Sequence, residues 1–201
     1  MGKLAELRQV LEGIAARIVG PVENAVAELP DRPRVRAGLL ELRDFARKLT
    51  SLSGRSRRGV QRISLEALCR TAGAELRRRY PGVEVRLEGG LAAGIRCHPE
   101  ELAQVLRCLL DNAAEAGAGR PILLRLQQDG GKVSVCVEDE GPGFPAGWRP
   151  FRPFRSTKPG HDGLGLYFCK TLVERNGGSI RILPPLDSGA RVQVIFPGEE
   201  P

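Results

Sequence analysis

Three stretches of the sequence carry polar groups, two of them beside glycines, that could together bind a flat, phosphate-bearing ligand. Asn112 stands in the apolar run LLDNAAEA, and its amide oxygen is a hard neutral donor of the kind that Mg²⁺ accepts beside phosphate oxygens. Asp139 precedes Gly141 and Gly143, so its carboxylate could accept a hydrogen bond from an exocyclic amine while the backbone approaches the ligand closely. The third stretch is a basic, glycine-rich segment that ends in GLGL.

This third stretch, residues 151–166 (FRPFRSTKPGHDGLGL), ends where a helix is expected to begin, at Leu164. The unpaired N–H groups of a helix N-terminus, its dipole and Lys158 favour phosphate oxygens, and the preceding loop could close as a lid. A loose dinucleotide-binding match in DEGPGFPA fails because Pro145 and Pro150 forbid the helix that it needs, and the sequence contains no Walker A motif. The order of the three stretches is a stronger signal than any one of them.

The elements that must position these groups follow from hydrophobic periodicity. We expect an α+β two-layer sandwich, with a mixed sheet covered on one face by helices. The expected helices span residues 65–79, 99–116 and 164–176, and the expected strands span 60–63, 83–87, 94–97, 122–127, 132–138, 179–183 and 191–196. Asn112 would then lie on a helix, Asp139 at the end of a strand, and GLGL at a helix start.

Residues 1–56 are expected to form an antiparallel helical hairpin. Apolar side chains recur at three- and four-residue spacing over residues 4–29, and a second striped helix is expected from Pro33. Two striped helices bury too little alone, so a symmetric four-helix dimer is the economical arrangement, and packing of the hairpin on its own downstream domain is the alternative. Residues 51–60 lose this periodicity and indicate a linker between two domains, 1–56 and 57–201.

The composition of the chain argues against a nucleic-acid-binding protein, a membrane-spanning protein and a disulfide-bonded protein. The 201 residues carry 31 basic and 24 acidic side chains, a net charge of +7, but the arginine clusters at 55–58 and 77–79 lack the interleaved aromatic residues typical of nucleic-acid binding. No apolar run is long enough for a membrane span or a signal peptide, so we expect a cytoplasmic location. The five cysteines form no CxxC pair, which favours buried, reduced thiols.

Residues from about 60 to 197 resemble the ATP-binding catalytic domain of sensor histidine kinases, within the ATPase superfamily that includes gyrase, Hsp90 and MutL. The runs LLDNAAEAG, DEGPGF and PFRSTKPG…GLGL are most similar to the nitrogen-regulation type of sensor kinase. The N, G1, F and G2 boxes of that family match Asn112, 139–143, 151–154 and 163–166.

The resemblance implies a left-handed Bergerat sandwich that binds ATP or ADP with Mg²⁺. It implies that Asp139 accepts a hydrogen bond from the adenine amine, that Asn112 is the magnesium ligand, and that Lys158 lies near the phosphates. The ATP-binding residues that it implies are Asn112, Asp139, Gly141, Gly143, Thr157, Lys158, Gly163, Leu164, Gly165 and Leu166.

Two positions depart from the family pattern. Family kinases usually carry an asparagine where Cys108 stands, and a thiol is a poor magnesium ligand and a poor base unless it is ionised. The hairpin resembles the dimerisation and phosphoacceptor hairpin of these kinases, whose histidine stands five residues before a proline. Pro21 fits that pattern, but the phosphoacceptor-equivalent position is Ala16, which has no nucleophilic atom. Autophosphorylation at the usual site is therefore chemically impossible.

The expected function is that of an ATP-binding, histidine-kinase-like core of two-component signal transduction. One alternative is a pseudokinase or ATP-dependent scaffold that controls a partner kinase or a response regulator. Another is a serine kinase of the anti-sigma-factor type, which the hairpin disfavours because such kinases generally lack it. The expected partners are a second copy of the chain, through residues 1–56, and a response regulator or partner kinase, but no nucleic acid.

If residues 1–56 form a four-helix dimer, a charge within the apolar stripe of the first helix should separate the two copies. Leu11→Asp would place a carboxylate in the buried seam, and light scattering at micromolar concentration should then show a monomer where the unmodified chain is a dimer. A monomer in both cases would contradict the dimer prediction.

Overall fold

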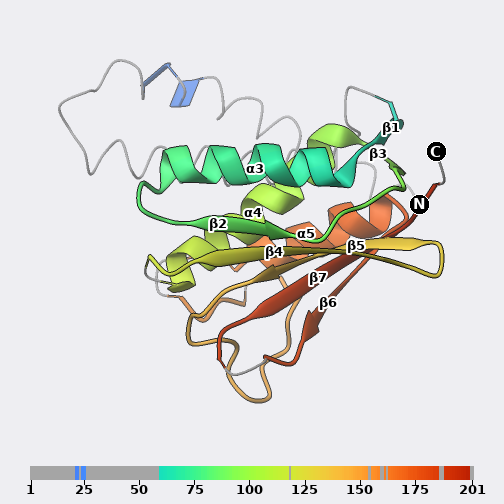
Figure 1. Ribbon diagram of the computed structural model, residues 1–201. Helices are drawn as coiled ribbons and strands as arrows, with labels where there is room; N and C mark the ends of the chain where they lie inside the picture. Colours follow the sequence, from blue (N-terminus) through green and yellow to red (C-terminus); the bar gives the residue numbers. More distant parts are fainter. Residues whose placement is uncertain are drawn as a thin grey trace, which may run out of the picture. The chain divides into compact units, whose positions relative to one another are not determined.

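The computed structural model describes residues 21–22, 24–25, 59–117, 119–153, 155–158, 161, 163–185 and 188–199. The chain divides into two compact units, Met1–Arg57 and Arg58–Pro201, and nearly all of the described residues belong to the second unit (Figure 1). The expected hairpin of residues 1–56, including Ala16, lies outside the described residues except for four helical residues near Pro21. Its role in dimerisation stays a prediction.

Every element expected after residue 59 is present, with its ends within two residues of the expected ones. The helices are α3 (Leu65–Arg79), α4 (Pro99–Gly117) and α5 (Gly165–Arg175). The strands are β1 (Gln61–Ile63), β2 (Val85–Glu88), β3 (Ile95–Cys97), β4 (Ile122–Asp129), β5 (Lys132–Glu138), β6 (Ser179–Leu183) and β7 (Arg191–Pro197). The strand expected from Val83 begins later because the Val83 N–H closes a turn onto the Tyr80 carbonyl, at 3.1 Å.

The main sheet contains five strands in the order β2-β4-β5-β7-β6. Strand β2 runs parallel to β4, whereas the other neighbouring strands are antiparallel, so the sheet is mixed as expected. Strands β1 and β3 pair with each other in a separate two-stranded sheet. The β4–β5 hairpin turns at Gly130 and Gly131, which both adopt positive φ.

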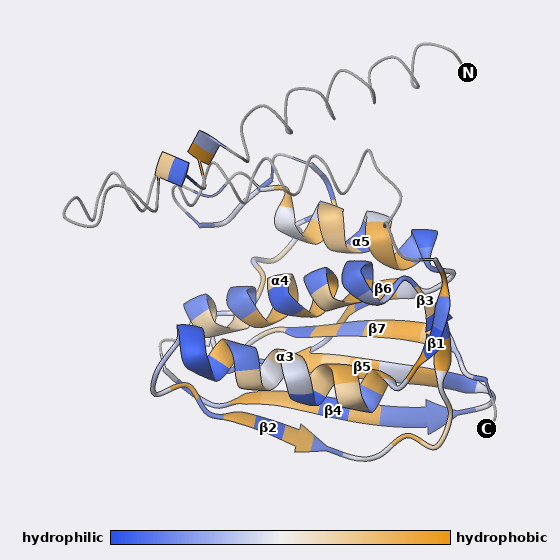
Figure 2. Ribbon diagram, turned by 90° about the horizontal axis from the view of Figure 1, so that it is seen from above, coloured by the Kyte–Doolittle hydropathy of each residue, from blue (hydrophilic) through white to orange (hydrophobic). Residues whose placement is uncertain are grey.

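All three described helices of this unit lie on one face of the sheet (Figures 1 and 2). Leu126, Val135 and Val194 lie side by side on neighbouring strands, and each is at most 3% exposed beneath the helices. Figure 2 shows that the central strands carry mostly hydrophobic residues. The α+β two-layer architecture predicted from the sequence is therefore confirmed.

The opposite face of the sheet carries a ladder of paired polar side chains. Glu138 of β5 is only 9% exposed, and its Oε1 accepts hydrogen bonds from Arg125 Nε of β4 (3.3 Å) and Arg191 Nη2 of β7 (3.4 Å). Further along the same face, Gln193 Nε2 of β7 donates to Ser134 Oγ of β5 at 3.1 Å. Because a buried carboxylate is tolerated only when it is paired, this ladder fixes the three central strands relative to one another.

A buried carboxylate joins the start of α4 to the end of α5. Glu101 is 4% exposed and accepts hydrogen bonds from Arg175 Nη1 (3.2 Å) and Asn176 Nδ2 (2.8 Å). The Asn176 Oδ1 also accepts the backbone N–H of His98, at 2.6 Å. With these ends tied together, the start of α5 lies beside the second half of α4, where Asn112 stands.

All five cysteines are free, and Cys108 is the one that is not buried. Burial raises the pKa of the Cys69 and Cys136 thiols to about 12, so both are neutral and unreactive near neutral pH. Within the part of the chain that the structure describes, no helix is both long enough and apolar enough to span a membrane.

Candidate functional site

Asp139 lies directly after β5, where the chain leaves the sheet. Its N–H donates to the Ala190 carbonyl at 3.0 Å, and its Oδ1 accepts the N–H groups of Gly141 (2.8 Å) and Ala190 (3.3 Å). Burial raises the pKa of Asp139, while the two amide hydrogen bonds and the charge of Lys158 act in the opposite direction. Since both of these hydrogen bonds go to Oδ1, Oδ2 is the atom that a ligand amine would meet.

Successive strand residues point to opposite faces, so Asp139 faces the helices whereas Glu138 faces the uncovered side. The loop after β5 packs tightly on the end of α4: a Cβ on Gly141 would lie 2.8 Å from the Ala116 carbonyl oxygen. Only glycine fits there without a shift of backbone. Asp139 is thereby held beside the helix that carries Asn112.

Two loops meet backbone to backbone beside Asp139. Gly189, in the connection from β6 to β7, has a φ of +85°, and a Cβ there would lie 1.7 Å from the Asp139 carbonyl oxygen. Gly143 has a φ of +71°, and its Cβ would lie 2.6 Å from the Gly189 carbonyl oxygen. Gly189 and Ala190 were not predicted from the sequence, although the run Ser188-Gly189-Ala190 just before a strand was a usable signal.

Asn112 lies on the side of α4 that meets the start of α5. Its Nδ2 is 3.9 Å from Cys108 Sγ, one helical turn earlier. A Cβ on Gly165 would lie 3.2 Å from that sulfur and 3.7 Å from Asn112 Nδ2, so glycine lets the two helices approach closely. The N-cap residue of α5, Leu164, has an apolar side chain and makes no side-chain capping hydrogen bond.

Lys158 reaches the same region from the loop before α5. Its Nζ donates to Glu115 Oε2 at 2.7 Å and to the Asn112 carbonyl oxygen at 3.1 Å. His161 Nε2 lies 3.8 Å from the same Glu115 oxygen. Glu115 was missed in the sequence, although its position three residues after Asn112 places both on one side of α4.

The remaining sequence-predicted positions lie at the edge of this group. Thr157 is exposed, and it is Ser156 that hydrogen-bonds within this turn, accepting the Lys158 N–H and donating to the Lys158 carbonyl, both at 3.0 Å. Leu164 is 3% exposed and belongs to the core. Gly163 adopts a φ of +66°, and its carbonyl accepts the Arg155 N–H at 3.4 Å. Leu166 is half-buried in the first turn of α5. The ligand contacts of these residues stay predictions.

The loop between the two glycine-rich stretches is stiffened by an aromatic pair. The rings of Phe144 and Trp148 stack with centroids 4.8 Å apart and an interplanar angle of 3°. The backbone N–H of Trp148 donates to the Pro145 carbonyl at 3.0 Å, which closes a turn between the two residues. Phe151 adopts a φ of 62°, in the left-handed region that residues other than glycine rarely occupy.

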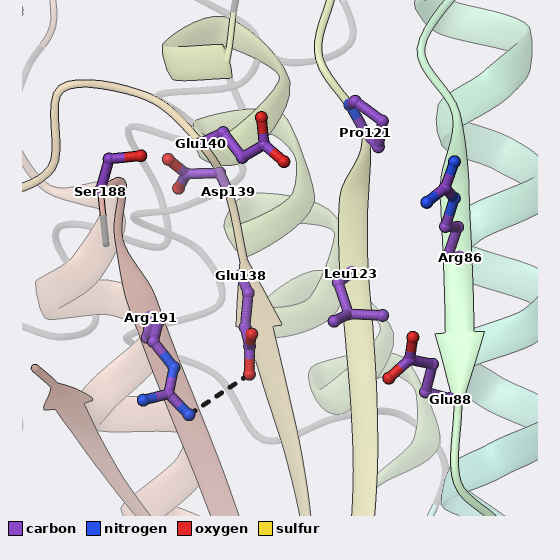
Figure 3. Close-up of a pocket in the computed structure, with 9 residues that line it drawn as sticks. All are labelled: Arg86, Glu88, Pro121, Leu123, Glu138, Asp139, Glu140, Ser188 and Arg191. Carbon is purple, nitrogen blue, oxygen red and sulfur yellow. Dashed lines mark hydrogen bonds and ion pairs between the residues drawn. The ribbon is translucent and has the colours of Figure 1, made fainter. Parts of the chain in front are cut away.

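A cavity of about 290 Å³ lies on the far side of Asp139, on the face of the sheet that the helices leave uncovered (Figure 3). Two guanidinium groups line it, and both are engaged: Arg86 with Glu84, and Arg191 with Glu138. Its lining residues are Arg86, Glu88, Pro121, Leu123, Glu138, Asp139, Glu140, Ser188 and Arg191. The cavity shares Asp139 with the region between α4 and α5 where the three sequence motifs meet, but Asn112, Lys158 and Gly165 are not among its lining residues.

A family model described as "Histidine kinase-, DNA gyrase B-, and HSP90-like ATPase" matches residues 97–200, more than half of the chain. The chain belongs to this ATPase family. The matched range contains Asn112, Asp139, Lys158 and Gly165, and the relatives identify it as the histidine kinase-like ATPase domain of sensor kinases.

Two curated relatives are themselves sensor kinases. The sensor histidine kinase ZraS of Escherichia coli O157:H7 is 31% identical over 170 residues, which cover 82% of this chain and 35% of ZraS. The sensory histidine kinase/phosphatase NtrB of Rhizobium leguminosarum bv. phaseoli is 36% identical over 100 residues, covering 40% of this chain and 26% of NtrB. The chain spans about a third or less of the first curated relatives that it matches.

Solved structures agree on the fold. The mycobacterial sensor histidine kinase MprB superposes with a TM-score of 0.61 at 25% identity, covering 71% of this chain and 99% of that one. Full-length ShkA, in complex with AMPPNP, superposes with a TM-score of 0.68 at 22% identity, covering 99% of this chain and 46% of that one.

Replacing Gly189 of this ATPase domain by alanine should destabilise it more than the same change at Gly147. Both glycines have positive φ, 85° and 74°, so each variant incurs a cost of about 1 kcal/mol for the left-handed backbone. A Cβ on Gly147 meets nothing within 4 Å, whereas one on Gly189 overlaps the Asp139 carbonyl, and we expect a further loss of about 1–3 kcal/mol. Urea unfolding measures both. Equal losses in the two variants would contradict the close approach of the two loops.

Proposed function

We propose that this domain binds ATP or ADP between α4, the loop after β5 and the start of α5, and that it belongs to a protein histidine kinase. The observation that carries the proposal is Asp139, a half-buried carboxylate with one oxygen held by two backbone amides and glycines on either side. Such a group recognises a flat ligand that offers an amine, as the adenine edge does. The AMPPNP complex of ShkA, which shares the fold, supports a nucleotide as the ligand.

Asn112 is the residue that we expect to hold Mg²⁺. Its amide nitrogen is turned toward Cys108, so its oxygen faces away from the sulfur, and oxygen is the donor that magnesium requires. The described residues contain no cluster of three His, Cys, Asp or Glu side chains that could hold a metal. A magnesium ion here would therefore depend on the phosphates and water for its other ligands, which fits the way Mg²⁺ usually binds, and it would neutralise phosphate charge.

The phosphates have two further binding groups in this chain. The first N–H groups of α5, which begins at Gly165, point toward the same region and carry the positive end of the helix dipole. Lys158 brings an ammonium within hydrogen-bonding distance of the Asn112 carbonyl. Phosphoryl transfer depends mainly on such positioning and charge stabilisation, so these groups are sufficient without a protein nucleophile in this domain.

We propose that the acceptor of the phosphoryl group belongs to another protein. Ala16 occupies the position of the family's phosphoacceptor, so the chain cannot phosphorylate itself there. A histidine on a partner kinase would then be the acceptor. In the alternative, the domain is a pseudokinase whose nucleotide state controls a response regulator.

Dimerisation through residues 1–56 and a cytoplasmic location belong to the same proposal. The serine-kinase alternative is less favoured because such kinases generally lack the hairpin.

Asp139→Asn should weaken adenine-nucleotide binding by about 1.5–3 kcal/mol, the range for a hydrogen bond to a charged group. The change replaces a carboxylate oxygen by an amide that cannot keep both its backbone bonds and the ligand's amine. Calorimetric titration with ADP measures the loss. Glu140→Gln, the same change of charge one residue later on an exposed side chain, is the matched control and should retain affinity.

The pH dependence of binding provides a second check on Asp139. Burial raises its pKa in the free protein, and a bound amine would favour the carboxylate and lower that pKa. Affinity should therefore be complete above the raised pKa and fall as the pH drops through it, and Asp139→Asn should lack this step. Unchanged affinity in Asp139→Asn would overturn the proposed nucleotide site.

Ala16→His should gain acid-labile, base-stable phosphorylation from ATP, while the unmodified chain gains none on itself. The γ-phosphorus would leave ADP and bond to the new imidazole nitrogen, which gives up its proton. Labelled ATP and acid–base stability of the product measure the gain, which Cys108 should slow. Phosphohistidine on the unmodified chain would refute the assignment of Ala16. If Ala16→His binds nucleotide but is not phosphorylated, the result would favour the pseudokinase.

A further inference from the structure

The loop before α5 brings two basic groups to Glu115. Its Oε2 accepts Lys158 Nζ at 2.7 Å, and His161 Nε2 lies 3.8 Å from the same oxygen. The side chains of Lys158 and Glu115 are 30% and 32% exposed, so the pair is partly shielded from water. Neither the sequence motifs nor the nucleotide site proposed above gives Glu115 a role.

The position of Glu115 on α4 makes this pair relevant to phosphate binding. Glu115 follows Asn112 by three residues, so the two side chains lie on one side of the helix. The Lys158 ammonium joins the Glu115 side chain to the backbone of Asn112, since it also donates to the main-chain carbonyl oxygen of Asn112 at 3.1 Å. Two of its three N–H groups are therefore committed to α4. A phosphate that recruits Lys158 must compete with a carboxylate for the same ammonium.

We propose that Glu115 is a positioning residue that holds Lys158 and its loop against α4 and thereby restrains the affinity of the site for phosphates. This inference rests on the proposed nucleotide site and deepens it. Glu115 acts through Lys158, so its influence is confined to ligands that carry phosphates. Binding of the adenine end of the ligand, which Asp139 would contact, should not depend on Glu115.

Two physical effects explain why Glu115 should lower the affinity of the site for phosphates. Glu115 contributes a negative charge next to the proposed phosphate position, and it neutralises the cation that would otherwise attract phosphate. Glutamine has nearly the same size and can still accept a hydrogen bond from Lys158, but it removes both effects. The side chain is about one third exposed, so the change in affinity should be that of a partly screened ion pair.

The binding test compares Glu115→Gln with the unmodified full chain by calorimetry, using ATP with magnesium and, separately, adenosine. ATP should bind roughly two- to fivefold more tightly to the variant, the range for such a pair, whereas adenosine should bind equally to both. Glu75→Gln is the matched control, because Glu75 also forms an exposed ion pair with an arginine, Arg107, but lies on α3. It makes the same change in net charge without touching Lys158.

The loop itself offers a second readout that does not need nucleotide. Between Gly141 and Gly163 the trypsin target residues are Arg149, Arg152, Arg155 and Lys158, and all except Arg155 precede a proline, which blocks cleavage. Cleavage after Arg155 therefore reports on this loop alone. If Glu115 holds the loop on α4, this cut should appear faster in Glu115→Gln than in the unmodified chain or Glu75→Gln, as followed by mass spectrometry.

The outcomes separate the two proposals. Tighter ATP binding with unchanged adenosine binding and a faster cut after Arg155 supports the role of Glu115. Equal or weaker ATP binding overturns it, as does an equal change for adenosine, which would indicate a general structural effect. Tighter ATP binding with an unchanged rate of cleavage also overturns it, because the effect would then be charge without loop positioning. If neither ligand binds the unmodified chain, the proposed nucleotide site is wrong, and the cleavage rates alone decide whether Glu115 holds the loop.

Discussion

A carboxylate can remain half-buried at the end of a strand only if hydrogen-bond donors replace the water that it loses, and much of this domain depends on that requirement at Asp139. The donors are the amides of Gly141 and Ala190, which belong to different loops. Ala190 is in place because β7 pairs with β5 in the register that the Glu138 ladder fixes. The candidate site is thus a consequence of sheet register rather than of the glycine-rich loop alone.

Helix α4 serves three purposes along its length. Near its start, Glu101 ties it to the end of α5, and one turn in the middle presents Cys108 and Asn112 to the beginning of that helix. Its last turns carry Glu115, which contacts the loop that leads back to α5. Because the two helices run antiparallel, a fixed contact at one end sets the spacing at the other.

The sequence contained enough information to predict the elements after residue 59 and to place Asn112 on a helix and Asp139 at a strand end, because these depend on local patterns. Alternation and helical periodicity marked the strands and helices, and Asn112 and Asp139 stood out as polar residues at apolar or strand-end positions. The contacts that the sequence did not reveal join residues far apart in the chain: Ala190 to Asp139, and Lys158 to Glu115, separations of 51 and 43 residues. Such pairs depend on which strands become neighbours and where a loop returns, and no local pattern encodes either.

The stacked pair of Phe144 and Trp148 gives the domain a built-in optical label. Trp148 is the only tryptophan in the sequence, so its emission reports on one place in the molecule, the turn that follows the glycines beside Asp139. Its indole ring lies against Phe144 and is only partly shielded from water, so its fluorescence should respond when that turn changes its surroundings. The two tyrosines of the sequence emit little at the wavelengths of tryptophan fluorescence, so they hardly contribute to this signal.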